Sequence, residues 1–508
     1  ICVAPDDDVE VRRITLINES DQPRRLRLTT YGEVALAPQA ADQRHPAFAK
    51  LFVESEYFAD LNALLFARRP RSAHEERQFL IHMLVRPRNV AQEVWGRATY
   101  ESDRAAFLGR GRTAQEPQAL VEGATPSAGA VGNTGPTLDP IMSLGQEIEL
   151  PARATVQVAA VTLAAPSRQA ALDLARRYRA WSTVGRVFTR SQLVAEAEMR
   201  ELEMTTPIME QAQQLLSLSL YSHAGRRADA AILNANNRGQ SGLWPFGISG
   251  DYPIVLLRMM DETQAELLED VLRAHTYWRR RGLNIDLVIL NRQTTNYGQP
   301  AQDFIHRLIQ RTGSNSRLNQ RGGLFVLRED QISEAERILL HSVARAVLDA
   351  ENGPLADQMS GLLRREPALP AFEPALPVDP LRDVTPPLIR PTDLQFDNGL
   401  GGFNADGEYV IYLRPGETTP APWINVIANA DFGCLVSETG AGYTWATNSG
   451  ENRLTTWRND PVSDMPAETV YLRDEETAEV WSPTPQPVPA DAPYLVRHGA
   501  GYSSFEHN

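Results

Sequence analysis

Short stretches in which hydrophobic and polar residues alternate dominate residues 1–165. Such stretches occur at 9–17 and 26–31, and the turn-forming residues Asn18–Pro23 separate them. β-Branched side chains in an alternating pattern favour strands, so the two stretches predict a β-hairpin. Further strands are expected at 78–85 and 155–163, and a long surface loop at 108–135, where Gly, Pro, Ser and Ala lack periodicity.

The hydrophobic spacing changes to three and four residues over 166–224. Ser167 can cap a helix through Ala170, Leu174 and Tyr178, and leucine and alanine keep helical spacing up to Leu220. This spacing is typical of helices with one apolar face. The stretch therefore predicts two or three amphipathic helices.

Residues 240–352 alternate short apolar runs with helical patterns. The expected strands are 253–257, 285–290 and 323–327, and the expected helices are 262–281, 301–310 and 333–348. Strands that alternate with helices indicate a parallel sheet. Neither GxGxxG nor GxxxxGK[ST] links a strand to its helix, so the pattern does not support nucleotide binding.

Proline and glycine define the last part of the chain. Eight prolines within 366–391 predict an extended linker. Residues 394–508 return to β patterning, with glycines at short spacing and many Trp, Tyr, Asn and Thr residues. Many short strands of this kind predict an antiparallel sandwich.

Composition limits the functions that the chain can have. The 508 residues carry a net charge of −14, which argues against a nucleic-acid surface. The only lysine is Lys50. No apolar run approaches 18 residues, so no membrane span is expected. The two cysteines form no CxxC, which excludes a zinc knuckle and a redox dithiol. Because the first residue is Ile1 and not Met, we expect a piece of a longer chain.

Single residues offer little catalytic signal. No two of the nine histidines stand at HxH or HxxxH spacing, so we expect no metal site. Ser249 lies in Gly247-Ile248-Ser249-Gly250-Asp251, where Asp251 replaces the last glycine of a nucleophile elbow; a turn before the next strand explains it better. Asp251 could be a catalytic carboxylate, but a turn or cap role is favoured.

The segment 442–460 carries the strongest chemical pattern. It combines two Trp, one Tyr, three Asn and two Arg in a loop bounded by glycines. Aromatic rings stack on the CH faces of sugars, while Asn and Arg bond their hydroxyl groups. We therefore expect carbohydrate contact at Trp445, Asn448, Arg453 and Trp457. The alternative is that these residues form a sandwich core and its turns.

Several segments resemble glycoside hydrolase family 94, in the version found in cyclic β-1,2-glucan synthases. The resemblance covers nearly the whole chain. It rests on 239–256, which contains Gly-Gln-Ser-Gly-Leu-Trp and Gly-Ile-Ser-Gly-Asp-Tyr-Pro-Ile-Val-Leu, and on the segments 31–36, 45–48, 68–71, 107–112, 394–403, 422–429, 437–445, 451–455, 471–474, 481–485 and 497–502.

The resemblance implies a region of a large bacterial inner-membrane enzyme that builds β-1,2-glucan from UDP-glucose and cyclises it. It also implies a phosphorylase-like module that controls chain length, with its catalytic residues in an (α/α)6 barrel. No barrel is expected here, so no catalytic residue and no cofactor is assigned. The implied partners are β-1,2-glucan or a gluco-oligosaccharide and other domains of the same chain, on the cytoplasmic side of the membrane-bound parent.

The expected fold is mixed. Two partial antiparallel β-sandwiches of the family 94 N-terminal supersandwich type are joined by helices and a small α/β region. The expected parts are the end of a first sandwich at 1–165, a helical linker at 166–239, an α/β segment at 240–365, a proline-rich linker at 366–393 and the start of a second sandwich at 394–508. Sandwiches cut in this way expose unpaired edges, so poor stability is expected. Two alternatives stay open: part of a soluble β-1,2-oligoglucan phosphorylase, and purely structural scaffold domains.

Overall fold

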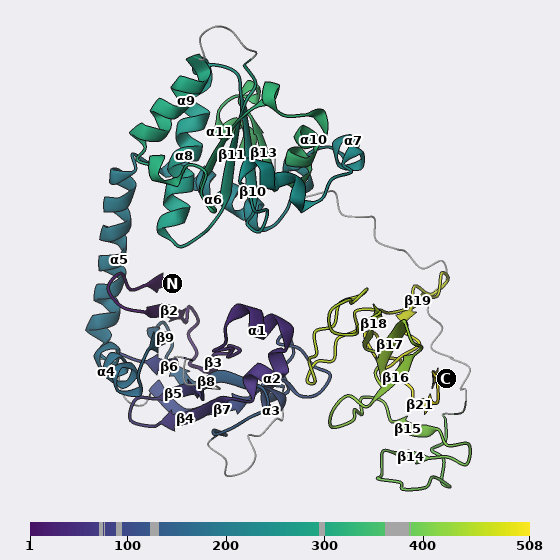
Figure 1. The fold of residues 1–508 in the computed structure, drawn as a ribbon. Coiled ribbons are helices and arrows are strands. Elements are labelled where there is room, and N and C mark those ends of the chain that lie inside the picture. The colour runs from purple at the N-terminus through teal and green to yellow at the C-terminus, as the bar shows by residue number, and fades with distance from the viewer. Residues whose placement is uncertain are drawn as a thin grey trace. The chain divides into compact units, whose positions relative to one another are not determined.

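The computed structural model describes residues 1–70, 75, 77–87, 94–121, 132–293, 300–360, 386 and 388–508. The chain forms two units (Figure 1). The first unit comprises Ile1–Ser191 and Pro370–Asn508 and is built from antiparallel sheets; the second comprises Gln192–Leu369 and is α/β. The fold class is the expected mixture. In the described part of the chain, no helix has the length and hydropathy needed to cross a membrane.

Residues 1–165 form two antiparallel sheets. The six-stranded sheet has the order β1 (Cys2–Val3), β2 (Val9–Ile17), β9 (Thr155–Ala165), β6 (Phe79–Val85), β5 (Ala63–Arg68) and β4 (Val53–Phe58). The three-stranded sheet has the order β3 (Arg24–Thr29), β8 (Pro140–Leu150) and β7 (Trp95–Asp103). The strands expected at 78–85 and 155–163 are thus confirmed as β6 and β9.

The larger sheet is buried on both faces, as β5 illustrates. Leu64 and Phe66 face the core that the two sheets share, whereas Ala63 and Leu65 face a second core. Helix α4 (Arg168–Tyr178) and the first turns of α5 (Trp181–Glu201) cover that second core. A strand buried on both sides is a continuous apolar run rather than an alternating one, which matches the sequence of β5.

The hairpin expected between β2 and β3 is wrong. Both strands exist, but β2 pairs with β1 and β9, and β3 pairs with β8. The connection 18–23 crosses between sheets. Asn18 is buried there and its Nδ2 donates to the carbonyls of Gln22 (2.8 Å) and Pro151 (2.9 Å), which ties this crossing to the one between β8 and β9. By crossing over, the two strands contribute apolar side chains to one core from opposite sides.

Three helices follow the first β region, as the spacing predicts. They are α4, α5 and α6 (Thr206–Leu220), and the Ser167 hydroxyl caps α4 by accepting from the amide of Ala170. Short helices occur elsewhere in the chain: α1 (Gln39–Arg44), α2 (Pro46–Lys50), α3 (Arg104–Leu108), η2 (Gln118–Leu120), η3 (Ala224–Arg226), α7 (Ala230–Ala235) and η4 (Gln240–Phe246). Residues 122–131 of the loop expected at 108–135 lie outside the described residues.

The α/β unit has a four-stranded parallel sheet, which confirms the expected parallel arrangement. The order is β12 (Leu324–Arg328), β11 (Asp286–Asn291), β10 (Ile254–Met259) and β13 (Ala346–Asp349). The helix expected at 333–348 is wrong at its end, because α10 ends at Val343 and residues 346–349 form the short strand β13. The intervening helices are η5 (Glu262–Gln264), α8 (Ala265–Arg280), α9 (Pro300–Arg311), η6 (Asn315–Arg317), η7 (Glu329–Gln331), α10 (Glu334–Val343), η8 (Ala350–Asn352) and α11 (Leu355–Met359).

The last part of the chain consists of small antiparallel sheets. The expected proline-rich linker before it lies outside the described residues except for 386 and 388–393. The sheets are β14 (Gly401–Phe403), β15 (Tyr409–Leu413), β21 (Tyr494–Gly499) and β22 (Tyr502–Glu506); β16 (Ile424–Ala428), β17 (Phe432–Ser437) and β18 (Gly442–Ala446); and β19 (Leu472–Arg473) with β20 (Val480–Trp481).

The first and last β regions pack together within the first unit. Phe107, Leu108 and Ile141 form a buried cluster with Val462, and the amide of Gly111 donates to the carbonyl of Val462 (2.7 Å). The segment that begins with α3 is therefore the contact between the two β regions. Whether these regions are parts of two separate sandwiches stays a prediction.

Candidate functional site

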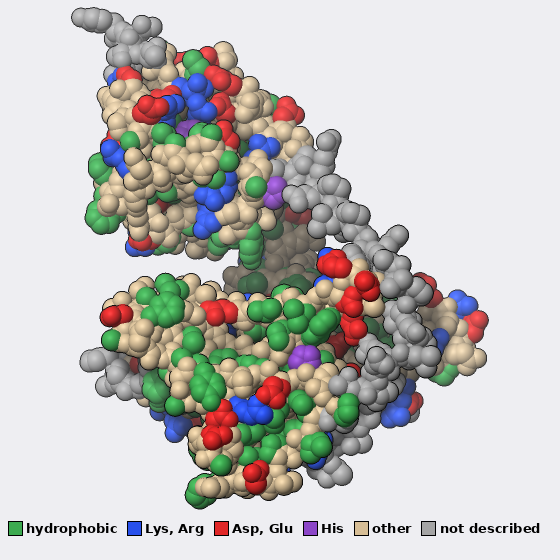
Figure 2. All heavy atoms as spheres, turned by 90° about the vertical axis from the view of Figure 1, so that its right-hand side faces the viewer, with side chains coloured by type: hydrophobic (Ala, Val, Ile, Leu, Met, Phe, Trp, Pro, Cys, Tyr) green, Lys and Arg blue, Asp and Glu red, His purple; other side chains and the backbone are tan. Residues whose placement is uncertain are grey.

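The sheet β16–β17–β18 presents an aromatic face. Its register places Tyr443 opposite Leu435 and Trp445 opposite Gly433, and Leu435 in turn stands opposite Val426. Opposed residues point to the same side of a sheet, so these side chains share one face. Val426 at its edge is 56% exposed, and Figure 2 shows hydrophobic side chains at the surface of this part of the molecule.

Three of the four residues expected to bind sugar meet around Tyr443. Its ring stacks on that of Trp457, with centroids 4.8 Å apart and planes 13° apart, and lies 5.2 Å from the ring of Trp445. The Arg453 guanidinium carbon lies 5.5 Å from the Trp457 centroid and 5.7 Å from that of Tyr443. Tyr443 itself is buried, whereas Trp445, Arg453 and Trp457 are half-buried. The cluster thus has a packed centre and an accessible edge.

Tyr443 is the member that the sequence-based selection missed. It stands two residues before Trp445 in a strand, and that period of two was the signal that both rings would share a face. Gly433 makes room for the cluster: a Cβ there would collide with the Trp445 indole. Because β17 carries only hydrogen at this position, the indole can lie flat against the neighbouring strand.

Asn448 has a different place. Its Oδ1 accepts from the amides of Gly450 (2.8 Å) and Glu451 (2.9 Å), so the side chain shapes the turn between β18 and Arg453. Among the described residues, no hydrogen bond joins its side chain to those of Trp445, Arg453 or Trp457. Asn448 is exposed.

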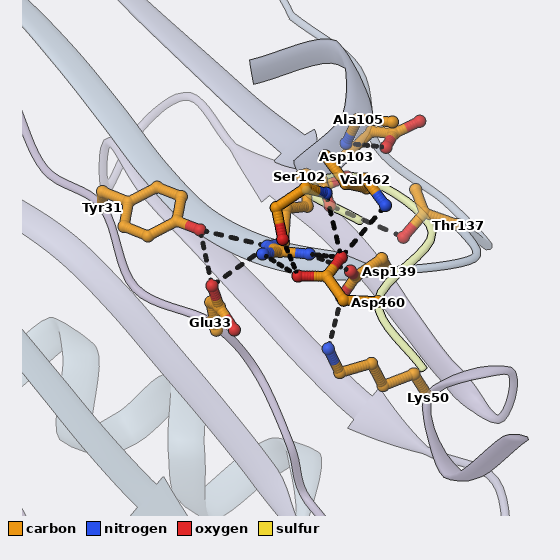
Figure 3. Close-up of polar contacts among 12 residues, drawn as sticks. Tyr31, Glu33, Lys50, Ser102, Asp103, Ala105, Thr137, Asp139, Asp460 and Val462 are labelled. Carbon is orange, nitrogen blue, oxygen red and sulfur yellow. Dashed lines mark hydrogen bonds and ion pairs between the residues drawn. The ribbon is translucent and has the colours of Figure 1, made fainter. Parts of the chain in front are cut away.

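A polar cavity of about 330 Å³ lies at the end of the same loop. Arg104 is at its centre and is only 7% exposed. Its Nη1 donates to Asp139 (2.9 Å) and to Asp460 (2.7 Å), its Nη2 to Asp460 (2.8 Å), and its Nε to Glu33 (3.0 Å), as Figure 3 shows. Lys50 forms an ion pair with the second oxygen of Asp139 (2.5 Å).

These contacts determine the protonation of the cavity. Burial raises the pKa of Asp460, but hydrogen bonds from Arg104 and Ser463 outweigh it and hold the pKa well below its usual range. Burial lowers the pKa of Arg104, but its bonds to Asp460 raise it by more. The pKa therefore lies above its ordinary value. Burial and a hydrogen bond with Glu33 raise the pKa of Tyr31 to about 12. Arg104 and Asp460 are therefore both charged near neutral pH, whereas the Tyr31 hydroxyl keeps its proton.

A second arginine links the two β regions nearby. Arg110 Nη2 donates to Glu438 (2.9 Å) and to Asp464 (3.0 Å). Glu438 is fully buried and also accepts from the amide of Trp423 (2.7 Å). Burial raises the pKa of Glu438. The loop that follows the aromatic cluster is thus held at Asp460 and at Asp464.

A family model described as the glycosyl hydrolase 94 supersandwich domain matches residues 1–181 and 407–508, which together are more than half of the chain. The chain belongs to the glycosyl hydrolase 94 supersandwich family. The residues of the aromatic face and of the Arg104 cavity all lie within the ranges that this family model matches.

The names of three curated relatives of this family 94 chain are those of enzymes that act on carbohydrates. The "Cyclic beta-(1,2)-glucan synthase NdvB" of Rhizobium meliloti (strain 1021) is 35% identical over 516 residues, which are 99% of this chain and 18% of NdvB. An "N,N'-diacetylchitobiose phosphorylase" of Vibrio furnissii is 38% identical, and one of Vibrio proteolyticus 35%, each over 21% of this chain and 13% of the phosphorylase. The chain thus spans less than a fifth of each relative.

The contacts of Ser249, Asp251 and His82 are those of residues with a structural role. Ser249 lies in the turn before β10, where its carbonyl accepts from Gln240 (2.8 Å), and Asp251 pairs with Arg321 (3.0 Å). His82 is buried between the hydroxyls of Thr30 and Thr162, and burial lowers its pKa to about 4. Within the described residues, no three His, Cys, Asp or Glu side chains are arranged to hold a metal ion.

Proposed function

We propose that this chain is a carbohydrate-binding, non-catalytic region of an enzyme that makes cyclic β-1,2-glucan. The observation that carries the proposal is the aromatic face around Tyr443, in a chain that is similar along 99% of its length to a cyclic glucan synthase. The catalytic residues of the whole enzyme then lie in other domains.

The aromatic face suits a neutral chain of sugars. The half-buried indoles of Trp445 and Trp457 offer apolar surface to sugar CH groups. The Arg453 guanidinium donates to hydroxyl groups, and the Nδ2 of Asn448 is available for the same purpose because only its Oδ1 is engaged in the turn. Val426 and Ile424, which are both exposed, extend the apolar surface along β16.

The properties that we propose for the parent enzyme rest on the same similarity to the cyclic glucan synthase. We propose that it transfers glucose from UDP-glucose, that it is bacterial and bound to the inner membrane, and that this region lies on the cytoplasmic side. The region would hold the growing β-1,2-glucan while other domains of the same chain extend and cyclise it. The ligand is therefore β-1,2-glucan or a gluco-oligosaccharide.

Two other functions remain candidates. The similarity to two chitobiose phosphorylases favours part of a soluble β-1,2-oligoglucan phosphorylase as the second candidate. Upstream sequence without membrane spans and without a glycosyltransferase domain would support it. A purely structural scaffold is the third candidate, and it predicts no affinity for glucan.

Affinity electrophoresis of the 508-residue chain through gels that contain β-1,2-glucan tests the proposal. We expect glucan to retard the chain, and Trp457→Ala to weaken the apparent affinity about tenfold, because a lost ring contact costs roughly 1–2 kcal/mol. Trp244→Ala is the matched control, since Trp244 is 63% exposed and lies in the α/β unit. Equal retardation of both variants, or none of the wild type, would refute it.

A further inference from the structure

The Arg104 cavity has the size of a small-molecule site. Its volume of about 330 Å³ is near the lower end of the roughly 300–1,000 Å³ that is usual for ligand pockets. It is built from separate parts of the first unit: Asp42 from α1, Lys50 from α2, Arg104 from α3, Asp139 before β8, and Arg458 with Asn459 from the loop that carries Trp457.

The charges that line the cavity determine which ligand it can take. Two of the lining cations are already neutralised, because the buried Arg104 bonds Asp139, Asp460 and Glu33, and the half-buried Lys50 bonds Asp139. The third lining cation, Arg458, leaves no net positive charge, because the lining also contains a fourth carboxylate, Asp42. A phosphate or a nucleotide would need positive charge that is not compensated in this way. The cavity therefore favours a neutral ligand over an anionic one.

Three polar side chains at the cavity can form hydrogen bonds with a ligand. The carboxylate of Asp42, the guanidinium of Arg458 and the amide of Asn459 line it, and among the described residues none of them has a side-chain hydrogen bond or ion pair. They supply acceptors and donors side by side, which is what hydroxyl groups require. Val34, Ala47 and Pro461 add apolar surface that can face CH groups.

The loop joins this cavity to the aromatic face. Trp457 stacks on Tyr443, whereas the next residue, Arg458, lines the cavity. The bonds from Arg104 to Asp460 hold the loop where it contributes both surfaces. Arg458 also lines a small pocket together with Trp457, so the loop presents adjacent residues to both surfaces.

We propose that the Arg104 cavity is a second carbohydrate subsite, which takes one glucose-sized unit of the glucan held at the aromatic face. The inference rests on the proposed function and goes beyond it. Asp42, Arg458 and Asn459 bond the hydroxyl groups, and the neutralised Arg104 and Lys50 pairs form the polar wall.

Lys50 makes the subsite measurable, because it is the only lysine in the chain. The 508-residue chain is acetylated with an N-hydroxysuccinimide ester, with and without the β-1,2-linked glucose disaccharide, and modification of Lys50 is followed by mass spectrometry. We expect saturating disaccharide to slow acetylation of Lys50 at least fivefold and to leave the chain's α-amino group unaffected. UDP-glucose and inorganic phosphate are expected to give no protection.

Variants on one helix provide the control. Asp42→Ala should shift the midpoint of protection to about tenfold higher disaccharide, because a hydrogen bond to a charged group is lost. Arg44→Ala, at an exposed position on the same helix, should leave the midpoint unchanged. If the pair with Asp139 keeps Lys50 unreactive, the disaccharide affinities of the two variants by calorimetry give the same comparison.

The outcomes separate this inference from the proposed function. Disaccharide that binds the chain without protecting Lys50, or with equal affinity in Asp42→Ala and Arg44→Ala, overturns the subsite and leaves the aromatic site intact. Protection by UDP-glucose or phosphate alone also overturns it. Absence of any disaccharide binding overturns both.

Discussion

Replacing Arg104 by methionine tests the contact between the two β regions. The guanidinium is buried and bonds Glu33, Asp139 and Asp460, whereas methionine keeps only the apolar stem. Asp460 then loses its basic partner, whereas Asp139 keeps its ion pair with Lys50. Removal of one member of a buried ion pair costs about 3–5 kcal/mol, and because Asp460 is partly accessible we expect about 3 kcal/mol at pH 7.

The loss should depend on pH in a defined direction. In the wild type the pKa of Asp460 is held below its usual range, so its stabilising contribution is present above the unfolded pKa and disappears as the pH falls through the folded value. Without Arg104, the pKa of Asp460 rises from this lowered value, because the largest favourable partner of its charged form is gone. In acid, Asp460 of the variant becomes protonated and no longer carries an unpaired charge. The difference in unfolding free energy between the two proteins therefore shrinks below about pH 4.

Urea unfolding at pH 7 and at about pH 3, followed by tryptophan fluorescence and circular dichroism, measures both effects. Arg112→Met is the matched control, because Arg112 is exposed and has no side-chain bond among the described residues. Equal losses in the two variants, a loss under about 1 kcal/mol for Arg104→Met, or a loss that is the same at both pH values would refute the reasoning.

Two further predictions concern stability and the aromatic face. The pKa of buried His82 is about 4, whereas an ordinary histidine has a pKa of 6.5. The folded chain should therefore lose stability as the pH falls from 6.5 to 4, by about 3 kcal/mol at most. Urea titrations should give a flatter pH profile of unfolding free energy for His82→Gln, and a profile identical to the wild type would contradict this. Gly433→Ala should displace the Trp445 indole and destabilise the chain by about 1–3 kcal/mol. Near-ultraviolet circular dichroism reads the displacement. Gly185→Ala, where a Cβ meets open space in α5, should leave this spectrum unchanged and should not destabilise the chain, because alanine favours a helix interior by up to about 1 kcal/mol over glycine.

Local patterns predicted many of the longer elements, but not β4, β5, β7 and β8. Alternation identified β2, β6 and β9, three-to-four spacing identified α4 to α6, and strand–helix alternation identified the parallel sheet of β10, β11 and β12. The short helices α1 to α3 were missed, because five or six residues are too few to establish a helical period.

Pairing depends on distant residues and was harder to predict. The turn residues 18–23 indicated a hairpin, but Asn18 bonds carbonyls more than 130 residues away and turns the connection into a crossing between sheets. Turn-forming residues indicate that the chain changes direction, but they do not determine which strand the next strand pairs with.

The site was predictable only in part, for a similar reason. Composition found Trp445, Arg453 and Trp457, which lie close together in sequence and in space. The cavity depends on Arg104 and Asp460, which are 356 residues apart. Neither is unusual in its own segment, so no local signal could have linked them.

Isothermal titration calorimetry of β-1,2-gluco-oligosaccharide into the 508-residue chain tests the central claim most directly. Carbohydrate binding at the aromatic face predicts a saturable heat with the wild type and with Trp244→Ala, and its loss when Trp445 and Trp457 are both replaced by alanine in a protein that still unfolds cooperatively. No heat from the wild type at millimolar oligosaccharide, or an unchanged affinity in the double variant, would contradict it.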